Sequence, residues 1–476
     1  MKLKIISLIS LCFLLFMGSC ENMIEEEIYS DLTEENFLTT EAGISAVLNQ
    51  AYVEAQQPGQ LYEHRFSESA INSGIAYGTG GSFQANTAVP FRDFTWTSNY
   101  NHFSTRWNSY YQGIRNANII IDNLADNESL SLEFKTQTTA EAKALRGYFY
   151  SLLLQNYGSI PLHTSILINE FQLPRSSETE IQELIEADLT DAIGVLPVSQ
   201  NLYGKYTKGT ALAILCRYYM NTKQWQNAAN TAKDIMDLNQ YELFPDYVSL
   251  FGHDNEQNSE AILVHPRTVA INGGSTVTAM MTPPDVPLLP NQGNYAMRLL
   301  VFDEFIDSFD ESDKRKDLFV TQYINKSGDL VQGYGNDMTY INKYPPDPNG
   351  SGFGNGIDFM EIRYASILLY RAEALNELNG PTQEVIDLIN MVRSRANVPL
   401  LSVGDFDQSS LRAHILKERF WEFWFEASER EDLIRNGTFV TRAQERGVVA
   451  ADYHTLYPIP QDEVDANTKL NQNPGY

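Results

Sequence analysis

Aromatic side chains stand beside amide and charged groups in segment 92–100, RDFTWTSNY, which has no helical period. A site for a neutral sugar needs aromatic faces that stack on sugar rings and amide or guanidinium groups that bond hydroxyls. We therefore expect Trp96 and Tyr100 to be stacking platforms and Asn99 to be a hydrogen-bonding group. The alternative is that Trp96 only fixes this loop to the core.

Two other irregular stretches carry the same residue types. Tyr77 and Phe83 flank the glycine-rich run YGTGGSF, and Asn291 and Tyr295 lie in a proline-rich stretch. These four residues are further ligand-binding candidates. The other tryptophans fall on helical faces, where we expect core packing: Trp107, Trp225, Trp421 and Trp424.

Catalysis finds little support in the residue patterns. A glycoside hydrolase needs two carboxylates across a cleft, and with 61 acidic residues sequence spacing cannot select a pair. The chain has no HExxH, G-x-S-x-G or G-x-x-x-x-G-K-[ST] motif, and its seven histidines are scattered singly. We expect no enzymatic activity, no cofactor and no metal site, with a surface glycoside hydrolase as the alternative.

The start of the chain reads as an export signal. Lys2 and Lys4 precede an apolar run, 5–17, that is too short to span a bilayer comfortably, and the run ends FMGSC. Small residues before a cysteine resemble the bacterial lipobox, so we expect a signal peptide at 1–20 and lipid on Cys20. An ordinary signal peptide with a chance cysteine is the alternative. No other apolar run is long enough to cross a membrane, which predicts a protein anchored to a membrane rather than embedded in it.

Charge and cysteines exclude several classes of protein. The net charge is −27, and removal of residues 1–20, with two lysines and no acids, gives 32 − 61 = −29. Phosphate backbones and anionic lipids would be repelled by this negative charge, which argues against both as partners.

The chain has three cysteines. Cys12 lies in the expected signal peptide and Cys20 is the expected lipid-carrying residue, so only Cys216 remains in the mature domain. We therefore expect neither an internal disulfide nor a cysteine metal site.

Two stretches predict pairs of antiparallel helices. In 362–396, apolar residues recur at helical spacing on both sides of Gly380 and Pro381, which end one helix and begin the next. In 207–241, a turn near Thr222 separates two further amphipathic helices. The length and small/large alternation of each pair suit tetratricopeptide-like repeats, and an ordinary helical hairpin is the alternative.

The remaining chain predicts one mainly all-α domain at 21–476, with loop-rich inserts at about 58–100 and 245–356. Helices are expected from Thr39 or Thr40, from about His102, and over 139–157, 178–195 and 409–435. The last of these is aromatic, and its charges are spaced for ion pairs along one helix. A short strand is expected at 261–264.

Several motifs in order resemble the SusD/RagB family of Bacteroidetes outer-membrane lipoproteins. They are W-x-x-YY-x-x-I-x-x-AN at 107–118, NYG-x-IPL at 156–162, RYA-x-ILL-x-RAEA at 363–374, ER-x-x-E-x-x-x-E at 418–426, R-x-DLIR at 430–435, YPIP at 457–460 and QNPGY at 472–476. The family commonly has Gly where Ala427 stands and a basic residue where Glu429 stands.

The resemblance implies a tetratricopeptide-like scaffold, expected to form a right-handed superhelix, that sits as a lid on a SusC-like TonB-dependent transporter. Such proteins capture oligosaccharides or polysaccharides at the outer face of the outer membrane without hydrolysing them. The region ahead of Trp107 often contributes ligand contacts in this family. The C-terminal run is similar to the starch and malto-oligosaccharide branch, which points to an α-glucan. A peptide or other non-glycan nutrient and a scaffold role that binds only the transporter are the remaining alternatives.

Overall fold

The computed structural model describes residues 37–56, 61–168, 170, 172–269, 274–296 and 298–476. The signal peptide expected at 1–20 and Cys20 lie outside this range. The first half of the chain is mainly helical, as predicted. Its helices are α3 (Glu41–Ala55), α4 (Leu61–Ser73), α5 (Gly81–Phe83), the π-helical turn η1 (Gln84–Ala88), α6 (Val89–Asp93), α7 (Asn101–Ala125), α8 (Leu132–Tyr157), α9 (Glu178–Val195), α10 (Lys208–Asn221) and α11 (Trp225–Asp237).

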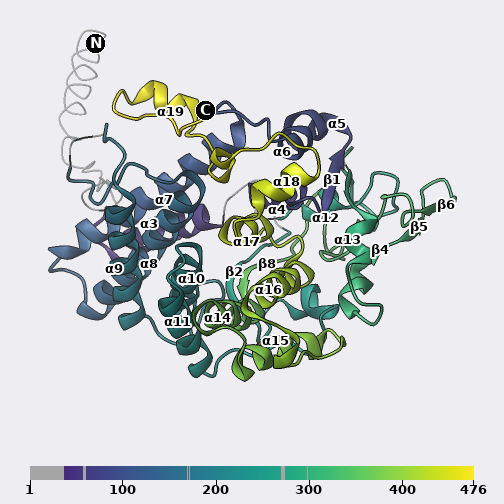
Figure 1. Cartoon of the computed structure of the whole chain (residues 1–476). Helices are drawn as coiled ribbons and strands as arrows, with labels where there is room; N and C mark the ends of the chain where they lie inside the picture. Colours follow the sequence, from purple (N-terminus) through teal and green to yellow (C-terminus); the bar gives the residue numbers. More distant parts are fainter. Residues whose placement is uncertain (1–36, 57–60, 169, 171, 270–273, 297) are drawn as a thin grey trace, which may run out of the picture.

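The second half contains short elements followed by a second helical group. Its helices are η2 (Ser249–Phe251), η3 (His253–Asn255), α12 (Val277–Met281), α13 (Asp303–Asp307), η4 (Lys314–Leu318), α14 (Tyr364–Asn379), α15 (Gln383–Arg395), η5 (Val403–Asp405), α16 (Gln408–Phe423), α17 (Glu429–Arg435), α18 (Phe439–Glu445), η6 (Asp452–Thr455) and α19 (Gln461–Ala466). In Figure 1 the teal-green excursion between the two helical groups extends to the right of the molecule.

Both predicted helix pairs are confirmed. The first pair is α10 and α11. Thr207 is the N-cap of α10, and its side chain accepts a hydrogen bond from the Thr210 amide. The second pair is α14 and α15, separated by Gly380 at φ 73. Thr382, one residue after the proline, provides the cap of α15, so Pro381 precedes that helix instead of lying in its first turn. Helices α11 and α14 pack against each other, which joins the two pairs into one layer.

Strands are few and short. Among the described residues they form four two-stranded antiparallel sheets. The pairs are β1 (Ala76–Thr79) with β3 (Arg298–Val301), β2 (Ala261–His265) with β8 (Phe359–Arg363), β4 (Phe319–Val320) with β7 (Tyr340–Ile341), and β5 (Gln322–Ile324) with β6 (Leu330–Gln332). The strand predicted at 261–264 is therefore present as β2.

Segment 58–100 has more regular structure than its sequence predicts. Helix α4 packs against α17 and α18, as Figure 1 also shows. Its buried face mixes Phe66 and Ala70 with charged and hydroxyl groups, because Glu68 pairs with Arg106 and Ser69 donates to Glu429. Polar residues that are buried through distant partners hide the apolar period on which a sequence prediction depends.

The single helix predicted over 409–435 is wrong. The chain breaks after α16, where Phe425 and Ala427 adopt left-handed φ values of 56 and 64, and α17 then begins at Glu429. The expected ion pairs along one helix are also replaced by pairs with other elements. Glu418 binds Arg315 and Arg393, and Glu422 binds Arg363 and Arg395, all buried.

One hydrophobic core runs through both helical groups, and Trp107 and Trp424 lie in it with 3% and 0% of their surface exposed. Trp225 and Trp421 are only partly buried against the same core. In the described part of the chain, no helix is both long and apolar enough to cross a membrane.

Candidate ligand-binding site

The strand pair β1–β3 brings two of the predicted candidate segments together. Thr79 pairs with Arg298 and Tyr77 with Leu300, so the glycine-rich run after β1 lies next to the stretch that precedes β3. A Cβ placed on Gly81 would lie 3.7 Å from the Cβ of Ala296. The candidates of 77–83 and 291–295 therefore belong to one region, although more than 200 residues separate them in the sequence.

A partly exposed aromatic stack lies in this region, formed by the exposed Phe353 and the half-buried Tyr295. The rings of Tyr295 and Phe353 are 4.4 Å apart between centroids and 12° from parallel, and Phe353 is 45% exposed. Aromatic rings of this kind supply large contact area with few rotatable bonds, which makes binding less costly in entropy. We call Tyr295 and Phe353 the aromatic platform.

Backbone hydrogen bonds hold the two loops of the platform in place. The Gly352 amide donates to the Asn291 carbonyl and the Gly293 amide donates to the Gly352 carbonyl, each at 2.7 Å. A Cβ on Gly293 would approach the Phe353 ring to 3.0 Å, so the glycine makes room for the ring. Asn291 is exposed at φ 69 in the same loop. The platform is thus preformed, with an amide side chain on one of its loops.

Phe83 is buried in this region, and Tyr77 is half-buried. The Tyr77 hydroxyl donates to the Asp337 carbonyl at 2.8 Å, and its ring lies 5.1 Å from that of Phe302. Phe83 is 7% exposed, and a Cβ on Gly78 would be 2.4 Å from its ring. Both rings therefore support the strand pair.

Trp96 is buried in the structure. Its exposed fraction is 4%, and its indole nitrogen donates to the Tyr476 hydroxyl at 2.8 Å. The rings of Phe91, Phe94 and Tyr457 pack within 5.8 Å of it. This geometry matches the alternative in which Trp96 fixes the loop to the core, and it leaves no ring face open for a sugar.

Asn99 and Tyr100 differ in their surroundings. Asn99 is exposed, in the turn that the Tyr100 amide closes onto the Thr97 carbonyl. Tyr100 is half-buried, and its hydroxyl lies 2.8 Å from His102 Nδ1 and 3.2 Å from a carboxylate oxygen of Glu68. Burial raises the pKa of the Tyr100 hydroxyl, so it stays neutral.

A row of rings connects Tyr100 to Phe83. Tyr100 contacts His102, His102 contacts His64 at 3.9 Å, and His64 stacks on Phe83 at 6.5 Å. Burial lowers the pKa of His64 to about 4, so its ring is neutral at physiological pH. The candidates near Tyr100 and those of the glycine-rich run 77–83 are thus connected by packed side chains.

Phe353 is the site residue that the sequence prediction missed. It stands alone in the run NGSGFGNG at 349–356, and a single large ring among glycines and amides was an available signal. No cluster of three or more possible metal ligands among His, Cys, Asp and Glu occurs within the described ranges.

Comparisons with known proteins agree on the family of this chain. The SusD family profile matches residues 302–476, and a second profile, described as starch-binding associating with outer membrane, matches residues 22–220. SusD-like protein P25 of Formosa agariphila is 24% identical, with 98% of each chain covered. The starch-binding protein SusD of Bacteroides thetaiotaomicron is 23% identical, with 71% of this chain and 72% of that protein covered.

Solved structures show the same architecture. A laminarin-binding SusD-like protein superposes with a TM-score of 0.77 at 25% identity, over 91% of this chain and 99% of the other. A SusD homolog from Bacteroides thetaiotaomicron gives a TM-score of 0.81 at 23% identity, over 95% and 100% of the two chains. These similarities confirm the tetratricopeptide-like helical fold, and together with the two profiles they show that the chain belongs to the SusD/RagB family.

Proposed function

We propose that this protein binds a neutral oligosaccharide or polysaccharide at the cell surface, with the aromatic platform as its stacking surface. The observation that carries the proposal is the preformed Tyr295–Phe353 stack, in which Phe353 is exposed, with Asn291 on one of its loops. Sugar rings offer apolar faces and hydroxyl edges, and this platform matches both. Asn99 is a further exposed amide for the same role, and Tyr100, Tyr77 and Phe83 support the loops.

The ligand class is supported by the relatives. One structural neighbour is described as laminarin-binding, and one sequence relative as starch-binding. Laminarin is a β-glucan and starch an α-glucan. We propose that the ligand is a glucan. The C-terminal run suggests an α-linked glucan, so starch and the β-linked laminarin are the two ligands to be tested.

The proposed cellular role is capture without hydrolysis. Lipid on Cys20 would hold the protein at the outer membrane, facing the exterior, where it would deliver its ligand to a SusC-like TonB-dependent transporter. The profile that names outer-membrane association supports this location. A surface glycoside hydrolase, a peptide-binding protein and a scaffold lipoprotein are the competing functions.

Affinity electrophoresis of the mature chain from Glu21 tests the proposal. Laminarin and starch are placed in separate gels. At least one of them should retard the wild-type protein, and neither should release reducing sugar. Tyr295→Ala with Phe353→Ala should weaken the retardation about tenfold or more, the loss typical of central aromatic contacts. Tyr334→Ala, which removes a 41% exposed tyrosine of the same excursion, serves as the control and should bind normally.

Three outcomes would contradict the proposal. Release of reducing sugar by the pure protein would favour the hydrolase. Binding that survives loss of both platform rings would place the site elsewhere. Absence of retardation by every polysaccharide would favour a peptide ligand or the scaffold role.

A further inference from the structure

A second pocket has none of the platform residues in its lining. It has a volume of about 830 Å³, and α13, α16 and α18 line it together with the residues that follow α17. Aromatic rings of Phe302, Phe305, Phe420 and Trp421 form part of its wall. We call it the basic pocket, because cations dominate the charged groups that line it.

The charge of the basic pocket is opposite to that of the protein. Four cations line it, Arg412, Lys417, Arg442 and Arg446, against two carboxylates, Glu304 and Glu445. The chain as a whole carries 61 acidic and 34 basic residues. A local excess of positive charge in so acidic a protein, inside a cavity, favours an anionic ligand.

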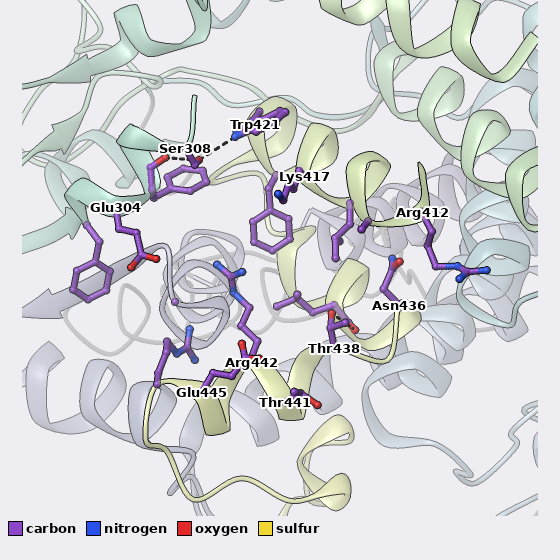
Figure 2. Close-up of a pocket in the computed structure, with 18 of the residues that line it drawn as sticks. Glu304, Ser308, Arg412, Lys417, Trp421, Asn436, Thr438, Thr441, Arg442 and Glu445 are labelled. Atoms are coloured by element: carbon purple, nitrogen blue, oxygen red, sulfur yellow. Dashed lines mark hydrogen bonds between the residues drawn. The ribbon is translucent and has the colours of Figure 1, made fainter. Parts of the chain in front are cut away.

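Arg442 lies at the centre of the pocket, as Figure 2 shows, and its charge has no ion-pair partner among the residues that the structure describes. Its Nε donates to the Ser73 carbonyl at 2.7 Å, which fixes the guanidinium. The guanidinium carbon lies 5.3 Å from the centroid of Phe420. Both terminal nitrogens are left for a ligand, in the fork geometry that suits carboxylates and sulfates.

Arg446 follows one helical turn later and is held in a similar way. One terminal nitrogen donates to the Asn72 carbonyl at 2.8 Å. The other lies where a Cβ of Gly74 would be, 1.4 Å away, so only a glycine at position 74 leaves room for it. No carboxylate within the described part of the chain pairs with this arginine either.

Both arginines are charged at neutral pH. Burial lowers the pKa of Arg442, and burial together with Arg442 lowers the pKa of Arg446 to about 10. Arg412, at the edge of the pocket in Figure 2, differs from them, because two of its nitrogens donate to the carboxylate of Glu377. Glu304 and Glu445 act on Arg442 only from beyond ion-pair distance. A bound anion would offset the remaining cost of burying the two guanidinium charges.

We propose that the basic pocket is a second glycan site that takes an acidic sugar unit, with a carboxylate or sulfate on Arg442 and Arg446. The partly buried Trp421 offers an apolar surface for the sugar ring, and Asn436 and Thr438 offer hydrogen-bonding groups. At physiological salt, repulsion of an anionic ligand by the distant negative charges of the protein is screened beyond about 8 Å. Ion pairs that a ligand makes with arginines inside the pocket are screened much less. The ligand class rests on the proposed glycan-binding function, but the site is independent of the platform.

Isothermal titration calorimetry of the mature protein tests this inference at neutral pH and physiological salt. The probes are oligogalacturonate for a carboxylate, oligosaccharides of chondroitin sulfate for a sulfate ester, laminarin as the neutral glycan, and sodium sulfate as the free anion. We expect one acidic oligosaccharide to bind, with an affinity well above that of free sulfate. Arg442→Gln with Arg446→Gln should weaken that binding about tenfold or more and leave laminarin binding unchanged.

Matched variants separate the specific effect from net charge and from unfolding. Lys233→Gln with Lys469→Gln removes two positive charges that are exposed and paired elsewhere, and it should leave acidic binding unchanged. If the double arginine variant does not fold, Lys417→Gln removes an exposed cation of the same wall and should weaken acidic binding at least twofold. Tyr295→Ala with Phe353→Ala should show the reverse pattern, losing laminarin and keeping the acidic ligand.

The inference is overturned if no acidic oligosaccharide binds the wild-type protein, if free sulfate binds as tightly as the oligosaccharide, or if acidic binding survives in both the double arginine and Lys417 variants. An equal loss in the lysine control would also overturn it. Failure of the proposed platform function is distinct, because binding of both laminarin and starch would then be absent while acidic binding remains.

Discussion

Ala427 occupies a backbone conformation that favours glycine. Its φ of 64 lies in the turn between α16 and α17, at the position where the SusD/RagB family commonly has Gly. A side chain in this region costs roughly 1–2 kcal/mol through contact of Cβ with the following carbonyl. The residue is therefore a local source of strain.

Ala427→Gly should increase the free energy of unfolding by about 0.5 kcal/mol. The relief of backbone strain exceeds the extra chain entropy that glycine gains on unfolding. Urea denaturation measures the change. Ala413→Gly, in the middle of α16 with an exposed side chain, is the control and should decrease the free energy by about 1 kcal/mol. Equal losses in both variants would show that the turn carries no strain.

At the scale of elements, a buried charge cluster joins α16 to the strand before α14. Arg363, at the end of β8, is fully buried and bonds Glu260, Glu422 and Glu426 at 2.5–2.9 Å. Lys343 shares Glu426 at 2.7 Å, and Arg395 of α15 shares Glu422 and Glu260. The cluster fixes how the repeat helices pack on the aromatic helix α16.

Arg363→Ala should lower the free energy of unfolding by about 3–5 kcal/mol, because it leaves buried carboxylates without their central partner. Thermal and urea unfolding, followed by circular dichroism, measure the loss. Lys233→Ala removes a cation from the exposed pair with Asp237 and should change stability by less than about 1 kcal/mol. A loss for Arg363→Ala no larger than this control would contradict the role given to the cluster.

The same elements show what the sequence could predict. The pairs α10–α11 and α14–α15 were predictable because their apolar period and caps are local. The break at Phe425 and Ala427 was not, because neither residue type indicates a left-handed turn. The partners of Glu418 and Glu422 lie on other elements, which spacing along one helix cannot reveal.

For the candidate site, the sequence identified aromatic and amide residues, but it could not show which of them are exposed. Tyr295 and Asn291 lie in the region of the platform, but Trp96 is buried because Tyr476 and the rings around it come from distant parts of the chain. The β1–β3 pairing that gathers the loops also has no local signal, since strands of four residues are too short to show a reliable period.

At the scale of the whole molecule, buried carboxylates set the response to acid. Burial alone would raise the pKa of Glu68 and Glu422, but their cationic partners outweigh it and lower both values from 4.5 to about 2. Arg106 and His102 act on Glu68, and three arginines act on Glu422. A carboxyl with a depressed pKa stabilises the folded state above its unfolded pKa, and this contribution is lost as the pH falls towards the folded pKa.

We expect the free energy of unfolding to fall by several kcal/mol between pH 5 and pH 3, with little of this loss above pH 5. Urea titrations at pH 7, 5, 4 and 3 measure it. Glu68→Gln should be less stable than wild type at pH 7 but should lose less stability on acidification. A stability that stays constant from pH 5 to pH 3 would contradict the depressed pKa values.

The hydrogen bond between Trp96 and Tyr476 spans 380 positions of the chain, and that between Ser69 and Glu429 spans 360. Contacts between such remote residues raise the contact order, which slows folding. The intervening chain must lose entropy to bring its two ends together before the contact can form. During synthesis, α4 and the loop at Trp96 must wait for residues made hundreds of positions later. The early part of the chain therefore stays incompletely folded until its distant partners have been made.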